Sequence, residues 1–184
     1  MLSNVGLRDA IRTGQLAIEG LKEESIQLAS IDLHLGNKFI LPLMNKKMLD
    51  MYSEESAKAH FSKAFKCVSG FTLLPRMLAL AATERVTLNN ELVAQVAGKS
   101  SVARAGIMVE SAGFIDPGFD GPITLEIYNQ MPFSILLIPG MPICQIAVTR
   151  LDIPADGVYG GKYVGSDGPV ASRYWMNKRP GGSV

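Results

Sequence analysis

The second half of the chain consists of short apolar runs separated by turn-forming residues, and this pattern constrains the fold more than any other feature. The sequence holds 18 glycines and 10 prolines, which suits many short strands joined by turns. Regularly spaced short strands of this kind are typical of an antiparallel barrel or sandwich. We therefore predict a mainly β fold, a barrel or a jelly-roll-like sandwich with a few short helices. The predicted strands are FTLLP, LALAATERV, ELVAQVAG, GPITLEIYN, SILLIPG and ICQIAVTRL.

The N-terminal segment predicts a short helix. Ser3 is a favourable N-cap, because its hydroxyl can accept a hydrogen bond from a free backbone N–H in the first turn. The apolar side of this helix would hold Leu7, Ala10 and Ile11, and the helix would end before Gly14.

The next segments predict one strand and one excursion. Residues 31–35 alternate apolar and polar side chains, as a half-buried strand does, and Gly36 ends this pattern. Residues 50–66 have the composition of an excursion or a short helix. The longest apolar run, FSILLIPGMPICQIAV, is interrupted by proline and glycine, so it predicts two strands and not a membrane span.

The length of 184 residues suits one domain, which we predict to span residues 1–184. After Pro154 the chain becomes polar and rich in glycine. Residues 155–184 are therefore either a frayed tail or a segment that becomes ordered over something else.

Composition excludes several functional classes. Hydrophobic residues make up 47% and charged residues 19% of the chain, which is ordinary for a globular protein. The net charge of +1 predicts neither a nucleic-acid surface nor a membrane surface. Cys67 and Cys144 are far apart and form no disulfide framework, and the N-terminus lacks the apolar run of a signal peptide. These features predict a cytoplasmic protein.

The motif GKSSVARAG is the first candidate binding site. Gly98 permits a tight turn, Lys99 supplies a cation, and Ser100 and Ser101 supply hydroxyls beside free backbone N–H groups. Between a strand and a short helical turn, these groups can hold phosphate oxygens, and Arg104 can face the same anion. A capped helix start with solvated cations is the alternative reading. The spacing of a Walker loop is absent.

Two carboxylates in the following segments are candidate catalytic groups. Asp116 precedes Pro117 and Gly118, where an aspartate is also an ideal turn residue. Glu126 lies at the centre of the apolar strand GPITLEIYN. It faces either solvent or a site, because a buried carboxylate needs partners. A partly buried glutamate with a raised pKa would be a competent general base.

The sequence gives no support for a zinc site or a catalytic triad. The soft ligands are His34, His60, Cys67 and Cys144, without an HxE, CxxC or HExxH spacing. A zinc deaminase of the H-x-E…P-C-x-x-C type is therefore excluded on its ligands. No serine has a recognisable histidine partner for nucleophilic catalysis.

In combination, three motifs resemble the dCTP deaminase branch of the dUTPase-like superfamily: G-K-S-S-x-A-R-x-G, A-G-F-I-D-P-G-F-x-G-x-I-T-L-E and P-G-M-x-I-x-Q. The resemblance extends to S-I-D-L-H-L-G-N-K-F and Y-G-G-K-Y, and it is weakest at residues 44–68. It implies a distorted β-barrel or jelly-roll subunit and a homotrimer with active sites at subunit interfaces. It also implies metal-independent hydrolytic deamination of dCTP, with Mg²⁺ bound through the triphosphate and no zinc.

The resemblance implies roles for individual residues. Glu126 would be the general base and proton shuttle, and Ser100 and Arg104 would place the water and orient Glu126. The backbone of Ala112 would lie near the base, and the tail would close over the triphosphate. The implied substrate-binding residues are Lys99, Ser100, Ser101, Arg104, Ala112, Asp116, Gln145, Tyr159, Lys162 and Ser166.

The chain departs from the family pattern at three places. Lys99 stands where many members have arginine, and Ser166 stands where many have glutamine. Gly113–Phe114 stands where strictly dUTP-forming members tend to have His-Arg, so the chain is more similar to bifunctional members that continue to dUMP and pyrophosphate. In those members the acid that matches Asp116 is associated with the second step.

The sequence leaves three functions open. The first is a dCTP deaminase, with dUTP or dUMP as its product and with or without inhibition by dTTP. The second is a dUTPase of the same superfamily, in which Glu126 would have no function. The third is a catalytically silent nucleotide-binding trimer, which turnover alone would exclude.

Overall fold

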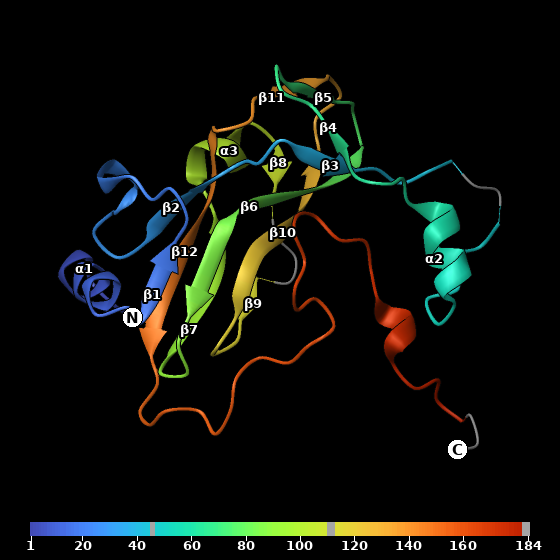
Figure 1. The fold of residues 1–184 in the computed structure, drawn as a ribbon. Helices are drawn as coiled ribbons and strands as arrows, with labels where there is room; N and C mark the ends of the chain where they lie inside the picture. The colour runs from blue at the N-terminus through green and yellow to red at the C-terminus, as the bar shows by residue number, and fades with distance from the viewer. Residues whose placement is uncertain (45–46, 110–112, 182–184) are drawn as a thin grey trace.

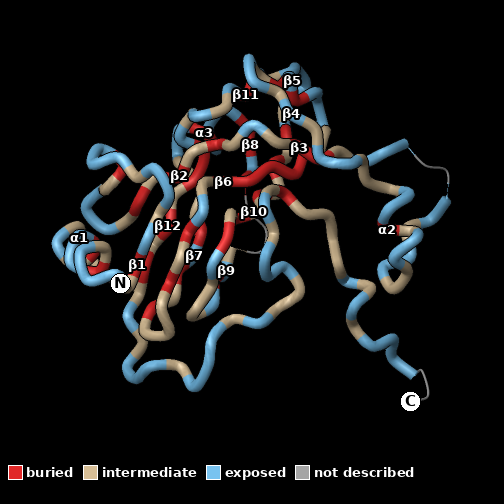
Figure 2. The backbone as a smooth tube through the Cα atoms, viewed as in Figure 1, coloured by how far each residue is buried: buried red, intermediate tan, exposed pale blue. Residues whose placement is uncertain are grey.

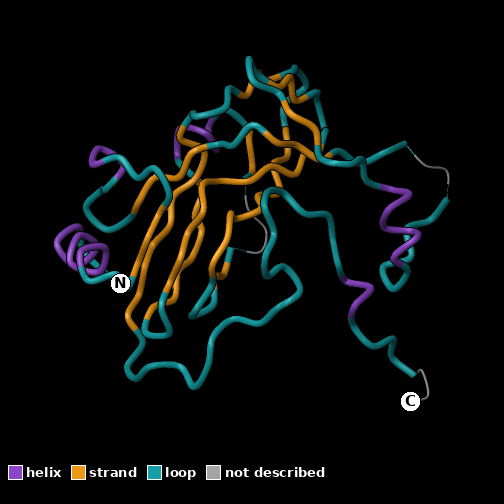
Figure 3. Tube along the Cα trace, viewed as in Figure 1, coloured by secondary structure: helices purple, strands orange, loops and turns teal. Residues whose placement is uncertain are grey.

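The computed structural model describes residues 1–44, 47–109 and 113–181. The fold consists mainly of antiparallel strands, with short helices at their periphery (Figures 1 and 3), as the sequence predicts. The helical segments are α1 (Asn4–Arg12), η1 (Glu23–Ser25), α2 (Glu54–His60), α3 (Ser100–Arg104) and η2 (Tyr174–Met176). The strands are β1 (Leu16–Ile18), β2 (Ile31–His34), β3 (Lys38–Ile40), β4 (Phe65–Lys66), β5 (Phe71–Leu73), β6 (Leu78–Leu88), β7 (Leu92–Gly98), β8 (Ile107–Met108), β9 (Phe114–Ile115), β10 (Asp120–Asn129), β11 (Ile135–Leu137) and β12 (Pro142–Arg150).

The described strands form three antiparallel sheets. The largest has the order β4-β3-β6-β10-β8, with β1 also paired to β6. The second has the order β2-β12-β7-β9, and β11 and β5 form a small pair. These sheets do not close into the expected barrel. Closure would require the edges to pair, and the edge strands β4, β8 and β9 are each two residues long.

The core lies between the two larger sheets, where the buried residues follow the strands (Figure 2). Along β10 the burial alternates, with Leu125 and Ile127 on the core side and Glu126 on the other side. The long partner strand β6 lies in register with it, so that Glu126 is opposite Leu80. A shift of register between Pro122 and Thr124 marks a bulge in β10. The mainly β core expected from the apolar runs is therefore present.

The N-terminal half follows its local sequence signals. Ser3 caps α1 and accepts a hydrogen bond from the N–H of Gly6, while Leu7 and Ala10 are completely buried. Strand β2 shows the predicted alternation, and the excursion at residues 50–66 contains α2, which is capped by Ser53. Helix α2 lies apart from the sheets (Figure 1).

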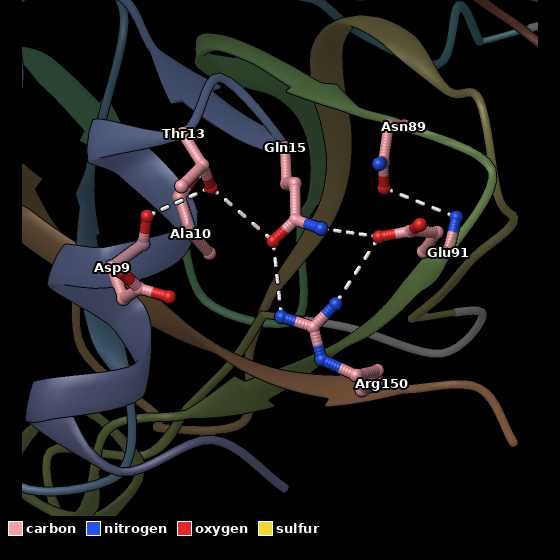
Figure 4. A network of polar contacts seen from close by, with 7 residues as sticks. All are labelled: Asp9, Ala10, Thr13, Gln15, Asn89, Glu91 and Arg150. Carbon is pink, nitrogen blue, oxygen red and sulfur yellow. Dashed lines mark hydrogen bonds and ion pairs between the residues drawn. The ribbon is translucent and has the colours of Figure 1, made fainter.

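A polar network ties α1 and β1 to the far ends of β7 and β12 (Figure 4). The Gln15 side chain donates a hydrogen bond to the Glu91 carboxylate and accepts one from Arg150 at 3.0 Å. Arg150 also donates to Glu91 at 3.1 Å, and the N–H of Glu91 donates to the Asn89 side chain. Three segments that are distant in sequence are thereby joined by charge-assisted hydrogen bonds. We call Gln15, Glu91 and Arg150 the rim network.

After β12 the chain passes back across the body and then runs out beside α2 (Figure 1). Near the C-terminal end of the chain, the Tyr174 ring packs edge-on against the Tyr52 ring, with 5.2 Å between the ring centres. The Arg179 guanidinium forms an ion pair with the Asp50 carboxylate, with 2.6 Å between nitrogen and oxygen. The segment 50–66 and the tail therefore contact each other through an aromatic pair and an ion pair. No helix among the described residues is long and apolar enough to span a bilayer. Cys67 and Cys144 are not joined in a disulfide.

Candidate active site

The side of β10 that faces away from the core borders a cavity of about 500 Å³. Thr124 and Glu126 reach it from β10, while Leu78 and Leu80 reach it from β6. The period of two in β10 places Thr124 and Glu126 on the same face, with their side chains half-buried. Glu126 is therefore half-buried and lines a partly open cavity, so it does not project from a flat solvent-facing side of the sheet.

The cavity has a largely aromatic wall. Phe114 and Phe119 come from the motif AGFIDPGFDG, and Tyr159 and Tyr163 come from the tail. The rings of Phe119 and Tyr159 lie 5.7 Å apart at an angle of 49°. Aromatic faces beside a few polar groups are suited to a planar heterocycle such as a nucleobase.

Asp116 lines the same cavity and also opens a turn. The N–H of Phe119 donates to the Asp116 carbonyl oxygen at 3.2 Å, and Gly118 has a positive φ of 75°. A Cβ atom on Gly118 would lie 2.4 Å from Cβ of Val158, so the tail packs directly on this turn. The N–H of Tyr159 donates to the carbonyl oxygen of Pro117 at 2.8 Å. The turn therefore positions both Asp116 and the start of the tail.

Gly113, which precedes β9, allows the backbone there to lie close to β7. A Cβ atom on Gly113 would lie 2.9 Å from the carbonyl oxygen of Val96 in β7. The N–H of Val96 also donates to the Gly113 carbonyl oxygen at 2.7 Å. A larger residue would push β9 away from β7, and Phe114 would then leave the wall of the cavity.

A second group of predicted residues gathers at the start of α3. As predicted, the motif GKSSVARAG joins strand β7 to a short helix, and Ser100, Ser101 and Arg104 are exposed there. The Lys99 ammonium lies 2.6 Å from a carboxylate oxygen of Asp32, and the two side chains are 23% and 12% exposed. Lys99 is thus fixed by an ion pair and does not extend into solvent.

Gln145 belongs to this second group. Its side chain accepts a hydrogen bond from Ser30 at 2.9 Å and donates one to the carbonyl oxygen of Gly98 at 3.3 Å. These contacts hold the turn that precedes α3. Among the described residues that line the cavity, none belongs to α3, and Gln145 is also outside it. The structure therefore brings Asp116, Glu126, Tyr159 and Ser166 together and places the α3 group elsewhere on the chain.

The remaining predicted residues have varied positions. Ser166 lines the cavity and donates to the carbonyl oxygen of Tyr163 at 2.8 Å. The Lys162 ammonium donates to the Asn177 side chain at 2.5 Å and lies 5.8 Å from the centre of the Tyr174 ring. Ala112 lies outside the described residues. The roles inferred for all of these residues remain predictions.

The histidines serve local structure. His34 pairs with Glu84 at 2.5 Å. Hydrogen bonds to the carbonyl oxygens of Lys47 and Ser56 raise the pKa of His60 above its ordinary value. Throughout residues 1–44, 47–109 and 113–181, no three His, Cys, Asp or Glu side chains converge as a metal-ligand group.

Some cavity residues were not identified from the sequence. Thr124 could have been found, because it shares the period-two face of Glu126. Phe114 and Phe119 lie in the motif AGFIDPGFDG, from which the sequence predicted Asp116 but neither aromatic residue as part of the cavity wall. Tyr163 ends the motif Y-G-G-K-Y, from which the sequence predicted Tyr159 and Lys162 as site residues but not Tyr163.

Comparisons with known proteins found relatives that match nearly the whole chain. A family model described as dCTP deaminase-like matches residues 1–151. A Persephonella marina protein named "dCTP deaminase, dUMP-forming" is 36% identical, over 97% of this chain and 99% of its own length. An Aquifex aeolicus protein of the same name is 37% identical over 97% of both chains. A Haloarcula marismortui protein named "dCTP deaminase" is 36% identical over 99% of this chain and 98% of its own.

A solved structure supports the fold. The crystal structure of 2'-deoxycytidine 5'-triphosphate deaminase from Agrobacterium tumefaciens superposes with a TM-score of 0.63 and 24% identity. The match covers 82% of this chain and 48% of that longer chain. The match therefore supports the fold of this chain.

Proposed function

Because the chain belongs to the dCTP deaminase-like family, we propose that it deaminates dCTP by hydrolysis and also cleaves the triphosphate, so that dUMP is the product. The observation that carries this proposal is the position of Glu126, on the wall of an aromatic-lined cavity that also holds Asp116. The complete reaction is dCTP with two waters giving dUMP, ammonia and pyrophosphate. Relatives of similar length whose printed names specify dUMP support this product.

Glu126 acts as the base and proton shuttle in the first step. Its carboxylate takes a proton from water and delivers it to N3 of cytosine while the hydroxide adds to C4. It then moves the hydroxyl proton to the amino group, which leaves as ammonia. A carboxylate in an enclosed site can perform both transfers, because one group within hydrogen-bond reach serves as base and then as acid. The aromatic wall formed by Phe114, Phe119 and Tyr159 offers ring faces on which the base can stack.

Asp116 takes part in the second step, the attack of water on the phosphate chain. It lines the same cavity as Glu126 and is fixed by the turn on which the tail packs. Phosphate oxygens would carry the Mg²⁺, which supplies charge neutralisation there. Asp116 on the cavity wall would fit such an ion, because Mg²⁺ on a triphosphate keeps several waters and needs few protein ligands.

The active protein is a homotrimer in which α3 of one subunit completes the cavity of another. Glu126 lies in the cavity, whereas Ser100 and Arg104 are exposed on α3 and do not line it. A cationic helix start that is displaced from its own cavity suits an interface at which a neighbouring subunit supplies the phosphate contacts. Lys99, Ser101 and Gln145 belong to this contributed group, and the tail residues Tyr159, Lys162 and Ser166 contact the nucleotide from the other side.

Product analysis tests the proposed reaction. The purified protein is incubated with dCTP and Mg²⁺, and the nucleotides are separated by anion exchange. We expect dUMP and pyrophosphate without accumulation of free dUTP. If dUTP were the sole product, Asp116 would act in the turn alone and the second step would be wrong. If dCTP were unchanged while added dUTP was cleaved, the protein would be a dUTPase.

Mixing two inactive variants tests the shared site. Glu126→Gln and Arg104→Gln are each expected to be inactive, because each removes one half of every site. After subunit exchange in an equal mixture, roughly a quarter of the sites should pair an intact Glu126 with an intact Arg104, if the two come from different subunits. Recovery of dUMP formation to about that level supports a site shared between subunits, and the mass of the assembly in solution then tests the trimer. A mixture that stays inactive despite proven exchange would place both residues in one subunit's site.

A further inference from the structure

One wall of the cavity is formed by a segment of the tail that contains no helix or strand. Residues 163–170, which we call the strap, pass over the face of the largest sheet. Tyr163, Ser166 and Val170 line the cavity together with Glu126. The shape of the cavity therefore depends on what holds the strap against the sheet.

Lys38, at the start of β3, makes one of these contacts. Its ammonium donates to the backbone carbonyl oxygen of Asp167 at 2.8 Å and lies 3.2 Å from a carboxylate oxygen of the same residue. The methylene stem of Lys38 packs against Gly168, where an added Cβ atom would lie 3.1 Å from Cδ of the lysine. Pro169, the next residue, is buried. Lys38 thus binds the strap by both its charge and its stem.

Thr124 makes the other contact from β10. Its hydroxyl oxygen accepts a hydrogen bond from the N–H of Val170 at 3.2 Å. Thr124 is two residues before Glu126 on the same face of the strand, so this bond fixes the strap beside the catalytic carboxylate. Within the described part of the chain, the hydrogen bonds that join the strap to the sheets come from Lys38 and Thr124. The bonds of Ser166 and Val164 stay within the tail.

The two parts of the Lys38 contact differ in strength. The Asp167 side chain is fully exposed, so its ion pair with Lys38 is screened by water and contributes little. The hydrogen bond to the backbone carbonyl oxygen does not require the Asp167 side chain. It is formed by a charged donor that is 35% exposed, and such bonds stabilise more than neutral ones.

We propose that Lys38 and Thr124 are positioning residues that hold the strap as a wall of the nucleotide cavity. Nucleotide binding needs the strap in this position, since Tyr163 and Ser166 reach the cavity through it. The consequence for substrate rests on the proposed function, whereas the consequence for the strap itself does not. Lys38 acts through the strap and touches no reacting atom.

Lys38→Met is the main test, because methionine keeps much of the stem and removes the ammonium. We expect hydrogen–deuterium exchange of the strap to increase several-fold in the ligand-free protein, because the closed conformation loses the charged hydrogen bond from Lys38. The KM for dCTP should rise about fivefold with kcat within about twofold of wild type, since the loss is in binding. Lys38→Arg should restore both values, and Asp167→Ala should resemble wild type.

Lys66→Met is the matched control. Lys66 lies directly opposite Lys38 across β3 and β4 and is exposed, so this variant removes the same charge from the same edge. It should leave strap exchange and KM unchanged. Thr124→Val provides an independent variant, which should increase exchange at the Val170 N–H. Thermal unfolding checks that every variant is folded.

Three outcomes separate the two proposals. Faster hydrogen–deuterium exchange of the strap in Lys38→Met but not in Lys66→Met supports the positioning role. This holds even if the wild-type protein fails to convert dCTP, a result that would contradict the proposed function alone. Unchanged exchange in Lys38→Met and Thr124→Val overturns the positioning role, even if dCTP is converted. A raised KM with unchanged exchange also overturns it, because Lys38 would then contact the nucleotide directly.

Discussion

The rim network and the cavity each contain a glutamate, and the two glutamates have different surroundings. Glu91 accepts hydrogen bonds from Gln15 and Arg150, whose segments are distant from it in sequence (Figure 4). Glu126 faces a cavity of about 500 Å³, with the aromatic wall and the strap on its other sides. The first carboxylate joins elements of the fold, and the second faces a volume that a ligand can occupy.

This difference shows that the neighbours of a carboxylate, more than its place in a strand, indicate its function. A carboxylate that accepts hydrogen bonds from two other segments of the chain stabilises their arrangement. A carboxylate beside an enclosed volume can exchange protons with whatever fills that volume. The contrast predicts that substitutions at the two positions affect different properties of the protein.

The largest expected effect comes from Glu126→Gln. The amide cannot accept a proton from water, so kcat for deamination should fall at least 100-fold, which is within the range of about 10²–10⁴ for the loss of a general base. Nucleotide binding and the thermal midpoint should be nearly unchanged. The crossed control is Glu91→Gln, which should keep activity within about twofold. Substantial turnover by Glu126→Gln would remove the distinction between the two glutamates.

Arg150→Met in the rim network is expected to lower stability and leave activity unchanged, which is the reverse of the effect expected for Glu126→Gln. It removes the donor to both Glu91 and Gln15, and we expect a loss of about 1 kcal/mol in the free energy of unfolding, because the arginine is partly exposed and screened. Urea unfolding measures this loss, and dCTP turnover at saturating substrate should be unchanged. A large fall in kcat without a loss of stability would link the rim network to the chemistry.

The smallest expected effect concerns Asp120, which opens the strand that carries Glu126. Hydrogen bonds from Arg85 and Thr87 hold the pKa of Asp120 below its ordinary value of 3.8. Because the folded-state pKa is the lower one, this contribution to stability is present above pH 3.8 and is lost as the pH falls through the folded-state value. The carboxylate is half-exposed, so the effect is small.

Urea midpoints of wild type and Asp120→Asn, measured from pH 7 to pH 3, test this expectation. The variant should be less stable at neutral pH, and the difference should shrink as the pH falls. Its dCTP turnover should resemble wild type, because Asp120 supports the start of β10 and does not line the cavity. A difference that stays constant with pH would contradict the role of the Arg85 contact.

Local signals were sufficient for much of the fold. The Ser3 cap, the alternation in β2 and the junction of β7 with α3 each depend on a few adjacent residues, so they could be predicted. The two-faced pattern of β10 likewise located Glu126. Closure of the sheets was not predictable in the same way, since it depends on how edge strands meet in space.

The site could be predicted less completely than the strands. Its carboxylates and the α3 motif lie close in sequence, and only the folded chain shows that they occupy different places. Lys38 meets Asp167 across 129 positions, and no periodicity or motif links the two. Contacts of this kind follow from the path of the whole tail, which adjacent residues do not specify.

The position of the strap in chain order has a consequence for biosynthesis. Every strand of the three sheets precedes the strap, so the body can fold while residues 163–170 are still to be translated. Lys38 is therefore translated early, and its hydrogen-bond partner Asp167 is translated 129 positions later. A nascent chain that has already formed its sheets still lacks one wall of the cavity until the ribosome has delivered residues 163–170.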